Sequence, residues 1–200
     1  LPRDGWRKLD AKIKATETAA DAELAIMPEA AGRYAFDMVS LFPKDTYKGR
    51  RNGLRRDLAE AIANLKPRFV RFPGGCVAHG NGIQNIYRWK NTVGPLESRK
   101  GMANIWRYHQ SVGLGFYEYF QFCEDMGAEP LPVLAAGVPC QNSSWGGDGQ
   151  QGGIPLGKEM DEYIQDVLDL IEWANGDKTT KWGRVRAEAG HPKPFNLKYV

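Results

Sequence analysis

A short segment from Phe69 to Gly80 combines the residue types best able to do chemistry in this chain. It reads Phe-Val-Arg-Phe-Pro-Gly-Gly-Cys-Val-Ala-His-Gly, so a thiol at Cys76 and an imidazole at His79 follow a pair of glycines. A Cys–His pair can supply a nucleophile and its base, but such pairs are normally assembled from distant segments and need a stabilised thiolate. The spacing alone therefore does not predict a thiol enzyme.

Paired carboxylates are the second chemistry to consider, because glycosidases place two of them about 5 to 9.5 Å apart across the bond that they cleave. In an α/β fold they would follow the carboxyl ends of strands. The segment after Phe72 is Pro-Gly-Gly-Cys and the segment after Ala136 is Gly-Val-Pro-Cys-Gln-Asn, and neither contains an acid. Acids of the predicted helices, expected mostly on solvated faces, are Glu118, Glu124, Asp125, Asp161, Glu162 and Asp166. The sequence thus predicts no catalytic carboxylate within these 200 residues.

The glycine pair allows two interpretations. Without a Cβ atom, Gly74 and Gly75 let a ligand approach the main chain closely at the carboxyl end of a strand, where α/β proteins build their binding sites. The same two residues could equally form a tight turn with no further role. The segment by itself does not separate these alternatives.

The elements around this segment alternate between strands and helices. Apolar runs at 69–72, 131–136 and 195–200 predict buried parallel strands, and amphipathic helices are expected at about 52–67, 116–127 and 158–174. The apolar residues expected on the inward helix faces are Leu54, Leu58, Ala61, Ile62 and Leu65 after a cap at Asn52, then Phe116, Tyr119, Phe120 and Cys123, then Met160, Tyr163, Ile164, Val167, Leu168 and Ile171.

This order is typical of a parallel α/β fold with right-handed crossovers. Three strands cannot close a barrel, so the chain forms either a small open sheet or part of a (β/α)8 TIM barrel. The apolar run at 195–200 favours the barrel, because an uncovered apolar strand edge of this kind would promote aggregation in water. We assign residues 44–200 to the N-terminal part of such a barrel.

The first 43 residues differ from the rest of the chain in their pattern of apolar and polar residues. Short runs of strand formers at 6–15, 23–27 and 33–41 are separated by polar, turn-prone stretches. This pattern is typical of antiparallel strands with one solvent-exposed face. We interpret residues 1–43 as the last strands of a β-sandwich of carbohydrate-binding type.

Composition excludes several classes of partner. A net charge of +3 and a pI near 8.7, without a basic block, predict no nucleic-acid partner. No apolar run is long enough for a membrane helix, so no membrane partner is expected. Cys76, Cys123 and Cys140 are scattered, so we expect neither a bound metal nor a disulfide framework, and no cofactor.

Three motifs in order resemble the α-L-arabinofuranosidases of glycoside hydrolase family 51. They are Arg-Phe-Pro-Gly-Gly-Cys-Val-Ala-His-Gly at 71–80, Tyr-Arg-Trp-Lys-Asn-Thr-Val-Gly-Pro at 87–95 and Glu-Tyr-Phe-Gln-Phe-Cys-Glu-Asp-Met-Gly-Ala-Glu-Pro at 118–130. The resemblance covers roughly residues 32–200. It implies a (β/α)8 barrel with a retaining mechanism, which releases terminal arabinofuranose from arabinan or arabinoxylan by means of two glutamates.

The resemblance also assigns residues. Gly75 and Cys76 would line the subsite for the arabinose ring, and Trp106 would lie near the leaving-group side, whereas Trp89 would pack beneath the site. The family's acid/base glutamate belongs to a Gly-Asn-Glu motif expected beyond Val200, and its nucleophile lies further on. The 200 residues alone are therefore expected to be inactive.

Two alternatives remain at this point. One is a non-catalytic carbohydrate-binding module, and the other is a barrel glycosidase acting on xylan or glucan, because one architecture hosts many chemistries. The expected partner is an arabinose-containing polysaccharide or oligosaccharide, with a possible homo-oligomer. A periplasmic or secreted location is favoured over a cytoplasmic one, although the sequence itself does not fix it.

Overall fold

The computed structural model describes residues 5–51, 53–140 and 153–200. The chain divides into two compact units, Leu1–Ser40 and Leu41–Val200. Among the residues described, none of the helices has the length and apolar character that crossing a membrane requires.

In the first unit, residues 5–40 form neither helices nor strands, and their side chains are exposed. The three strand segments predicted between residues 6 and 41 are therefore absent here. A strand persists only when its backbone N–H and C=O groups pair with a neighbour, and in the described part of the chain none of these runs has one. The β-sandwich assignment of residues 1–43 stays a prediction.

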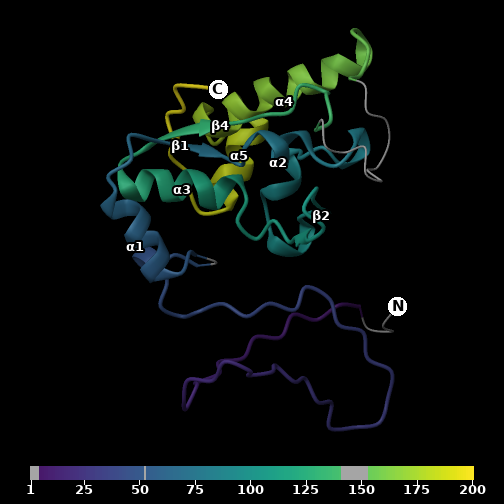
Figure 1. The fold of residues 1–200 in the computed structure, drawn as a ribbon, viewed down its shortest axis with the longest axis vertical. Coiled ribbons are helices and arrows are strands. Elements are labelled where there is room, and N and C mark those ends of the chain that lie inside the picture. The colour runs from purple at the N-terminus through teal and green to yellow at the C-terminus, as the bar shows by residue number, and fades with distance from the viewer. Residues whose placement is uncertain (1–4, 52, 141–152) are drawn as a thin grey trace. The chain divides into compact units, whose positions relative to one another are not determined.

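The second unit contains a pair of parallel strands. Strand β1 (Phe69–Phe72) pairs with β4 (Glu129–Pro132), with Phe69 opposite Glu129 and Phe72 opposite Pro132. Figure 1 shows helix α3 (Phe116–Met126) running beside this pair. The parallel arrangement of the first two predicted strands is confirmed, although β4 begins two residues before the predicted run at 131–136.

The sequence predicts that strand β1 is buried, but in the structure only one of its faces is covered. Its side chains alternate between exposed and half-buried, and Phe69 is 58% exposed. The physical reason is that Val70 and Phe72 pack against the core around α3, whereas Phe69 and Arg71 point to the opposite face, which is exposed.

The remaining elements are mostly short. A small antiparallel hairpin joins β2 to β3. The bounds are α1 (Arg56–Asn64), α2 (Gly75–His79), β2 (Met102–Ala103), β3 (His109–Gln110), α4 (Lys158–Asn175) and α5 (Lys181–Glu188), with single 3-10 turns η1 (Tyr47–Gly49), η2 (Ile83–Asn85), η3 (Trp89–Thr92) and η4 (Leu96–Ser98).

Helix α3 agrees closely with its sequence pattern. The predicted stripe is buried, with Phe116 and Cys123 fully inaccessible. The helix ends where Gly127 adopts a left-handed conformation with φ of 71°, which a glycine reaches without steric cost. Helical spacing and a glycine stop thus sufficed to place this element.

An aromatic core joins α3 to α4. The Trp173 ring lies 5.1 Å from that of Phe120 and 5.8 Å from that of Trp89, measured between ring centroids. Trp89 and Phe116 approach to 6.2 Å. These rings come from three separate segments, so they hold η3 and both helices together.

Helix α4 has the predicted bounds but turns a different face inward. The predicted apolar face is partly wrong: Ile164 and Leu168 are each 53% exposed and Ile171 is 40% exposed. The buried side chains are Tyr163, Asp166, Asp169, Leu170, Trp173 and Ala174. Asp166 and Asp169 can face inward because Arg88 and Lys90, at the start of η3, pair with them. Helical periodicity cannot reveal such a contact.

The third predicted strand is also wrong. Residues 195–200 are irregular, because backbone contacts there go to the end of α4 and not to a neighbouring strand. Phe195 donates its N–H to the carbonyl oxygen of Ala174 at 2.8 Å, and Leu197 donates to the side chain of Asn175 at 2.6 Å. The basic stretch before it forms α5, whose cap Thr180 accepts a hydrogen bond from the N–H of Gly183.

Helix α1 exposes most of its apolar stripe. Leu58, Ile62 and Leu65 of the predicted stripe are 55%, 44% and 79% exposed, so the predicted inward face of this helix is wrong. The buried residue of the helix is Ala59, which lies outside that stripe. The predicted cap, Asn52, lies outside the described residues, and the helix itself begins at Arg56.

We predict a large loss of stability when Gly80, which follows α2, is replaced by alanine. The residue has φ of 68°, and a Cβ atom there would lie 1.9 Å from the carbonyl oxygen of Asn85. Backbone strain and overpacking together should cost about 3 kcal/mol. Gly127→Ala is the matched control: φ is 71° but the added methyl meets open space, so the expected cost is about 1 kcal/mol. Equal unfolding midpoints for the two variants would contradict the predicted collision.

Candidate functional site

The carboxyl end of β1 turns sharply into a short helix. A cis peptide bond joins Phe72 to Pro73, and Gly74 then adopts φ of 109° and ψ of 159°, a region that side chains with a Cβ rarely enter. Helix α2 starts at Gly75. A Cβ atom built on Gly75 meets no atom closer than Arg71 Nη2 at 3.6 Å, so the space above this residue is open.

Cys76 is half-buried in α2, and its sulfur faces another thiol. Cys140, which is 1% exposed, lies within hydrogen-bonding distance of Cys76. This hydrogen bond is the main cause of a raised pKa at Cys76, and burial raises the pKa further. The thiol is therefore protonated at neutral pH and is not an activated nucleophile.

His79 does not pair with Cys76 in this structure. Its Nδ1 donates to the carbonyl oxygen of Val138, since a carbonyl can only accept. The Cys–His dyad considered from spacing alone therefore has no geometric support.

Trp106 lies on the turn between β2 and β3. Its ring is 51% exposed and stacks with that of Tyr108, with centroids 6.3 Å apart and planes at 20°. The side-chain oxygen of Asn104 accepts the backbone N–H of Trp106 at 2.9 Å and so shapes the turn. Among the described residues, no hydrogen bond or ring contact joins Trp106 to Gly75 or Cys76.

Trp89 confirms its predicted role as packing. The ring is 1% exposed, and its Nε1 donates to the carbonyl oxygen of Asp166 at 2.9 Å.

Two helix acids expected on solvated faces are buried, and both are ion-paired. Glu118 is 7% exposed and receives two hydrogen bonds of 2.8 Å from Arg99. Asp166 is 6% exposed and lies 2.5 Å from Arg88 Nε and 2.9 Å from Lys90 Nζ. A catalytic carboxylate must face its substrate, whereas these two face cations that hold loops in place.

Comparison with known proteins places these features in a family. Residues 61–200 match the family profile described as Alpha-L-arabinofuranosidase 1 domain. The chain is 49% identical to an extracellular exo-α-L-arabinofuranosidase of Streptomyces chartreusis and 40% identical to α-L-arabinofuranosidase 2 of Arabidopsis thaliana, in each case over 98% of its length. It also superposes on the arabinose-bound MgGH51 α-L-arabinofuranosidase with a TM-score of 0.68 and 38% identity, over 78% of this chain and 23% of that one.

The chain belongs to the glycoside hydrolase family 51 α-L-arabinofuranosidases. It spans about a quarter of the length of the relatives from Streptomyces and Arabidopsis, 24% and 27% respectively. The resemblance inferred from three motifs is thus confirmed. The alternative of a non-catalytic binding module is not favoured, because these relatives are α-L-arabinofuranosidases by name.

Sequence reasoning missed one residue at the candidate site of this arabinofuranosidase segment. Cys140 was treated as one of three scattered cysteines, yet it contacts Cys76. A signal for it exists, because both cysteines follow predicted parallel strands, and parallel strands bring their carboxyl ends to the same edge of a sheet. Residues 141–152, which follow Cys140, lie outside the described residues.

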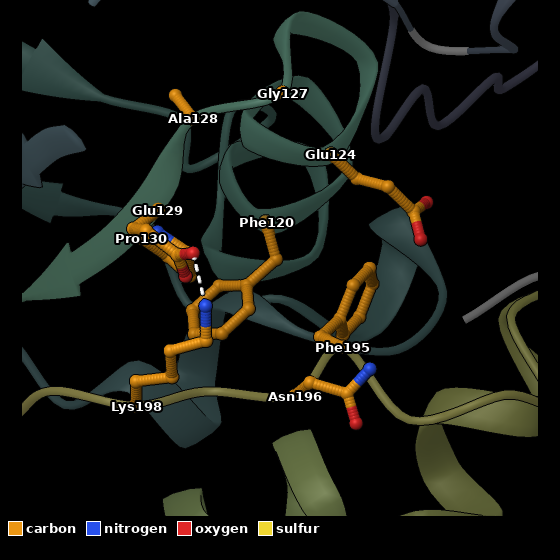
Figure 2. A pocket seen from close by; sticks show the side chains of 9 residues that line it. All are labelled: Phe120, Glu124, Gly127, Ala128, Glu129, Pro130, Phe195, Asn196 and Lys198. Atoms are coloured by element: carbon orange, nitrogen blue, oxygen red, sulfur yellow. Dashed lines mark hydrogen bonds and ion pairs between the residues drawn. The ribbon is translucent and has the colours of Figure 1, made fainter. Parts of the chain in front are cut away.

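A cavity of about 320 Å³ lies elsewhere in the family 51 segment. Figure 2 shows it between the end of α3, the start of β4 and residues 195–198, with the rings of Phe120 and Phe195 as walls. Gly75, Cys76 and Trp106 do not line it. Its charged rim is paired, since Lys198 bonds to Glu129 at 2.5 Å and Glu124 to His191 at 2.9 Å. This amino end of β4 is not where α/β enzymes place their chemistry.

Proposed function

We propose that the protein containing this chain is a retaining α-L-arabinofuranosidase, which removes terminal arabinofuranose from arabinan or arabinoxylan. The observation that carries the proposal is the open glycine turn followed by a half-buried thiol at the carboxyl end of β1, in a chain of this family. In parallel α/β folds that end of the strands is where substrates bind.

In this proposal β1 and β4 are neighbouring strands of a (β/α)8 barrel, preceded by a β-sandwich in the first 43 residues. The parallel pairing with a helical crossover supports the barrel, because that connection is its repeating unit. The two catalytic glutamates come from outside these 200 residues. The buried acids of α3 and α4, which are Glu118, Asp166 and Asp169, are paired with cations, and this agrees with a catalytic pair supplied from elsewhere.

Gly75 and Cys76 form part of the wall around the arabinose ring, and Trp106 lies on the leaving-group side. An exposed indole stacked on Tyr108 suits contact with the apolar face of a sugar ring. A secreted enzyme is favoured because the Streptomyces relative is described as extracellular.

Gly75→Leu tests the site in the full-length protein. Since a Cβ atom at Gly75 has room, the variant should keep the wild-type unfolding midpoint while its side chain occupies the sugar's place. We expect kcat/KM for an aryl α-L-arabinofuranoside to fall at least about tenfold, with Gly75→Ala in between. Unchanged kinetics with an unchanged midpoint would refute the placement of the pocket wall.

The reaction itself is tested on aryl glycosides. The full-length protein should hydrolyse aryl α-L-arabinofuranoside much faster than aryl xyloside or glucoside, and proton NMR should show that the first-formed arabinose keeps its anomeric configuration. Faster cleavage of the xyloside or glucoside, or an inverted product, would overturn the assigned specificity or mechanism.

A further inference from the structure

Two thiols from distant parts of the chain meet at the carboxyl edge of the strand pair. Cys76 belongs to α2, which follows β1, and Cys140 belongs to the segment that follows β4. Neither forms a disulfide in this structure, and a side-chain hydrogen bond joins the two thiols. The contact therefore joins the segment that follows β1 to the segment that follows β4.

The backbone holds these two segments together independently of the sulfur atoms. Cys140 donates its N–H to the carbonyl oxygen of Gly80 at 3.3 Å, and the side chain of His79 donates to the carbonyl oxygen of Val138. At the base of both segments, Val133 donates to the carbonyl oxygen of Phe72 at 2.8 Å. The two thiols are therefore kept close by neighbouring hydrogen bonds, and their approach does not depend on a flexible tail.

The two cysteines also differ in access, as the partners of an exchange reaction do. Cys76 is half-buried and can be reached by a small reagent, whereas Cys140 is 1% exposed. Cys123, by contrast, is fully buried in α3, and burial raises its pKa to about 12, so it is inert.

We propose that Cys76 and Cys140 are a redox-active pair that closes to a disulfide in the presence of a small-molecule disulfide such as oxidised glutathione. The Cys76 thiolate attacks one sulfur of the oxidant, which forms a mixed disulfide and expels one thiolate. The Cys140 thiolate then attacks the Cys76 sulfur and releases the second. The protein loses two hydrogens, and the oxidant is reduced to two thiols.

The bridge should control the arabinose pocket, a consequence that rests on the proposed function. Once bonded to Cys140, the sulfur of Cys76 no longer carries a hydrogen and is drawn toward the buried segment. The sugar then loses a contact on one wall of its site. The raised pKa of Cys76 leaves little thiolate at neutral pH, so the disulfide forms slowly. Under reducing conditions both cysteines stay as thiols.

The test uses the full-length protein, oxidised glutathione and peptide mass spectrometry. After incubation and blocking of remaining thiols with N-ethylmaleimide, a non-reducing digest should contain a peptide pair linked through Cys76 and Cys140. The kcat/KM for an aryl α-L-arabinofuranoside should fall at least about threefold and recover after dithiothreitol.

Cys140→Ala is the matched variant, because it keeps Cys76 but cannot close the bridge, and Cys123→Ala is the control that still can. Under oxidised glutathione the first should lack the linked peptide and keep a glutathione adduct on Cys76, because no second thiol resolves it. The second should form the linked peptide and lose activity as the wild type does. In the wild-type protein, a stable glutathione adduct on Cys76, or no modification, would overturn the pair. A linked peptide with unchanged kinetics would overturn its control of the pocket. Absence of arabinofuranoside turnover in both redox states would instead overturn the proposed function and leave the linked peptide standing.

Discussion

Arg99→Met is expected to destabilise the fold by about 3–5 kcal/mol, because it leaves a carboxylate buried without its cation. The side chains of Arg99 and Glu118 are 4% and 7% exposed, and two hydrogen bonds of 2.8 Å join them. Arg99 also donates to the carbonyl oxygens of Gly94, Val112 and Gly113, so both ends of the loop that carries Trp106 depend on it. The measurement is the unfolding midpoint of the full-length protein by calorimetry.

A double variant and a surface pair serve as controls for Arg99. In Arg99→Met/Glu118→Gln the buried charge is gone while an oxygen remains for the N–H of Gly115, so stability should recover in part. Arg184→Met breaks an exposed pair whose side chains are 67% and 71% accessible and should change little. If Arg99→Met and Arg184→Met lower the unfolding midpoint equally, the loop is not held by the Arg99–Glu118 ion pair.

Trp173→Ala should cost about 3–5 kcal/mol, since it empties the centre of the aromatic core. The side chain is fully buried and touches the rings of Trp89, Phe120 and Phe195. These rings belong to separate segments, so the cavity would loosen η3, α3 and the chain after α5 together. Calorimetry of the full-length protein again gives the effect.

Trp173→Phe separates lost packing from lost hydrogen bonding. Nε1 of Trp173 has no hydrogen-bond partner within the described chain, so removing this donor carries no penalty of its own. We expect a cost below about 1.5 kcal/mol, since most of the ring volume remains. A phenylalanine variant as unstable as the alanine variant would contradict the view that ring packing dominates here.

Local pattern was enough for some elements and for the family. The strand at 69–72, the stripe of Phe116 to Cys123 and the stop at Gly127 all follow from spacing and from glycine's freedom at positive φ. The three motifs sufficed to recognise the arabinofuranosidase family, which the comparisons confirm. The assignment of Gly75, Cys76 and Trp106 to the sugar site remains a prediction.

Contacts between distant segments decided the rest. Which face of α4 is buried depends on Arg88 and Lys90, which neutralise Asp166, and on the ring of Trp89 opposite Trp173. Cys140 stands beside Cys76 because β1 and β4 pair in parallel and bring their carboxyl ends together. Periodicity along a chain encodes the length and type of an element, since these depend on neighbouring residues. The partner of a buried charge or thiol is chosen when separate elements pack, and local sequence carries no record of that choice.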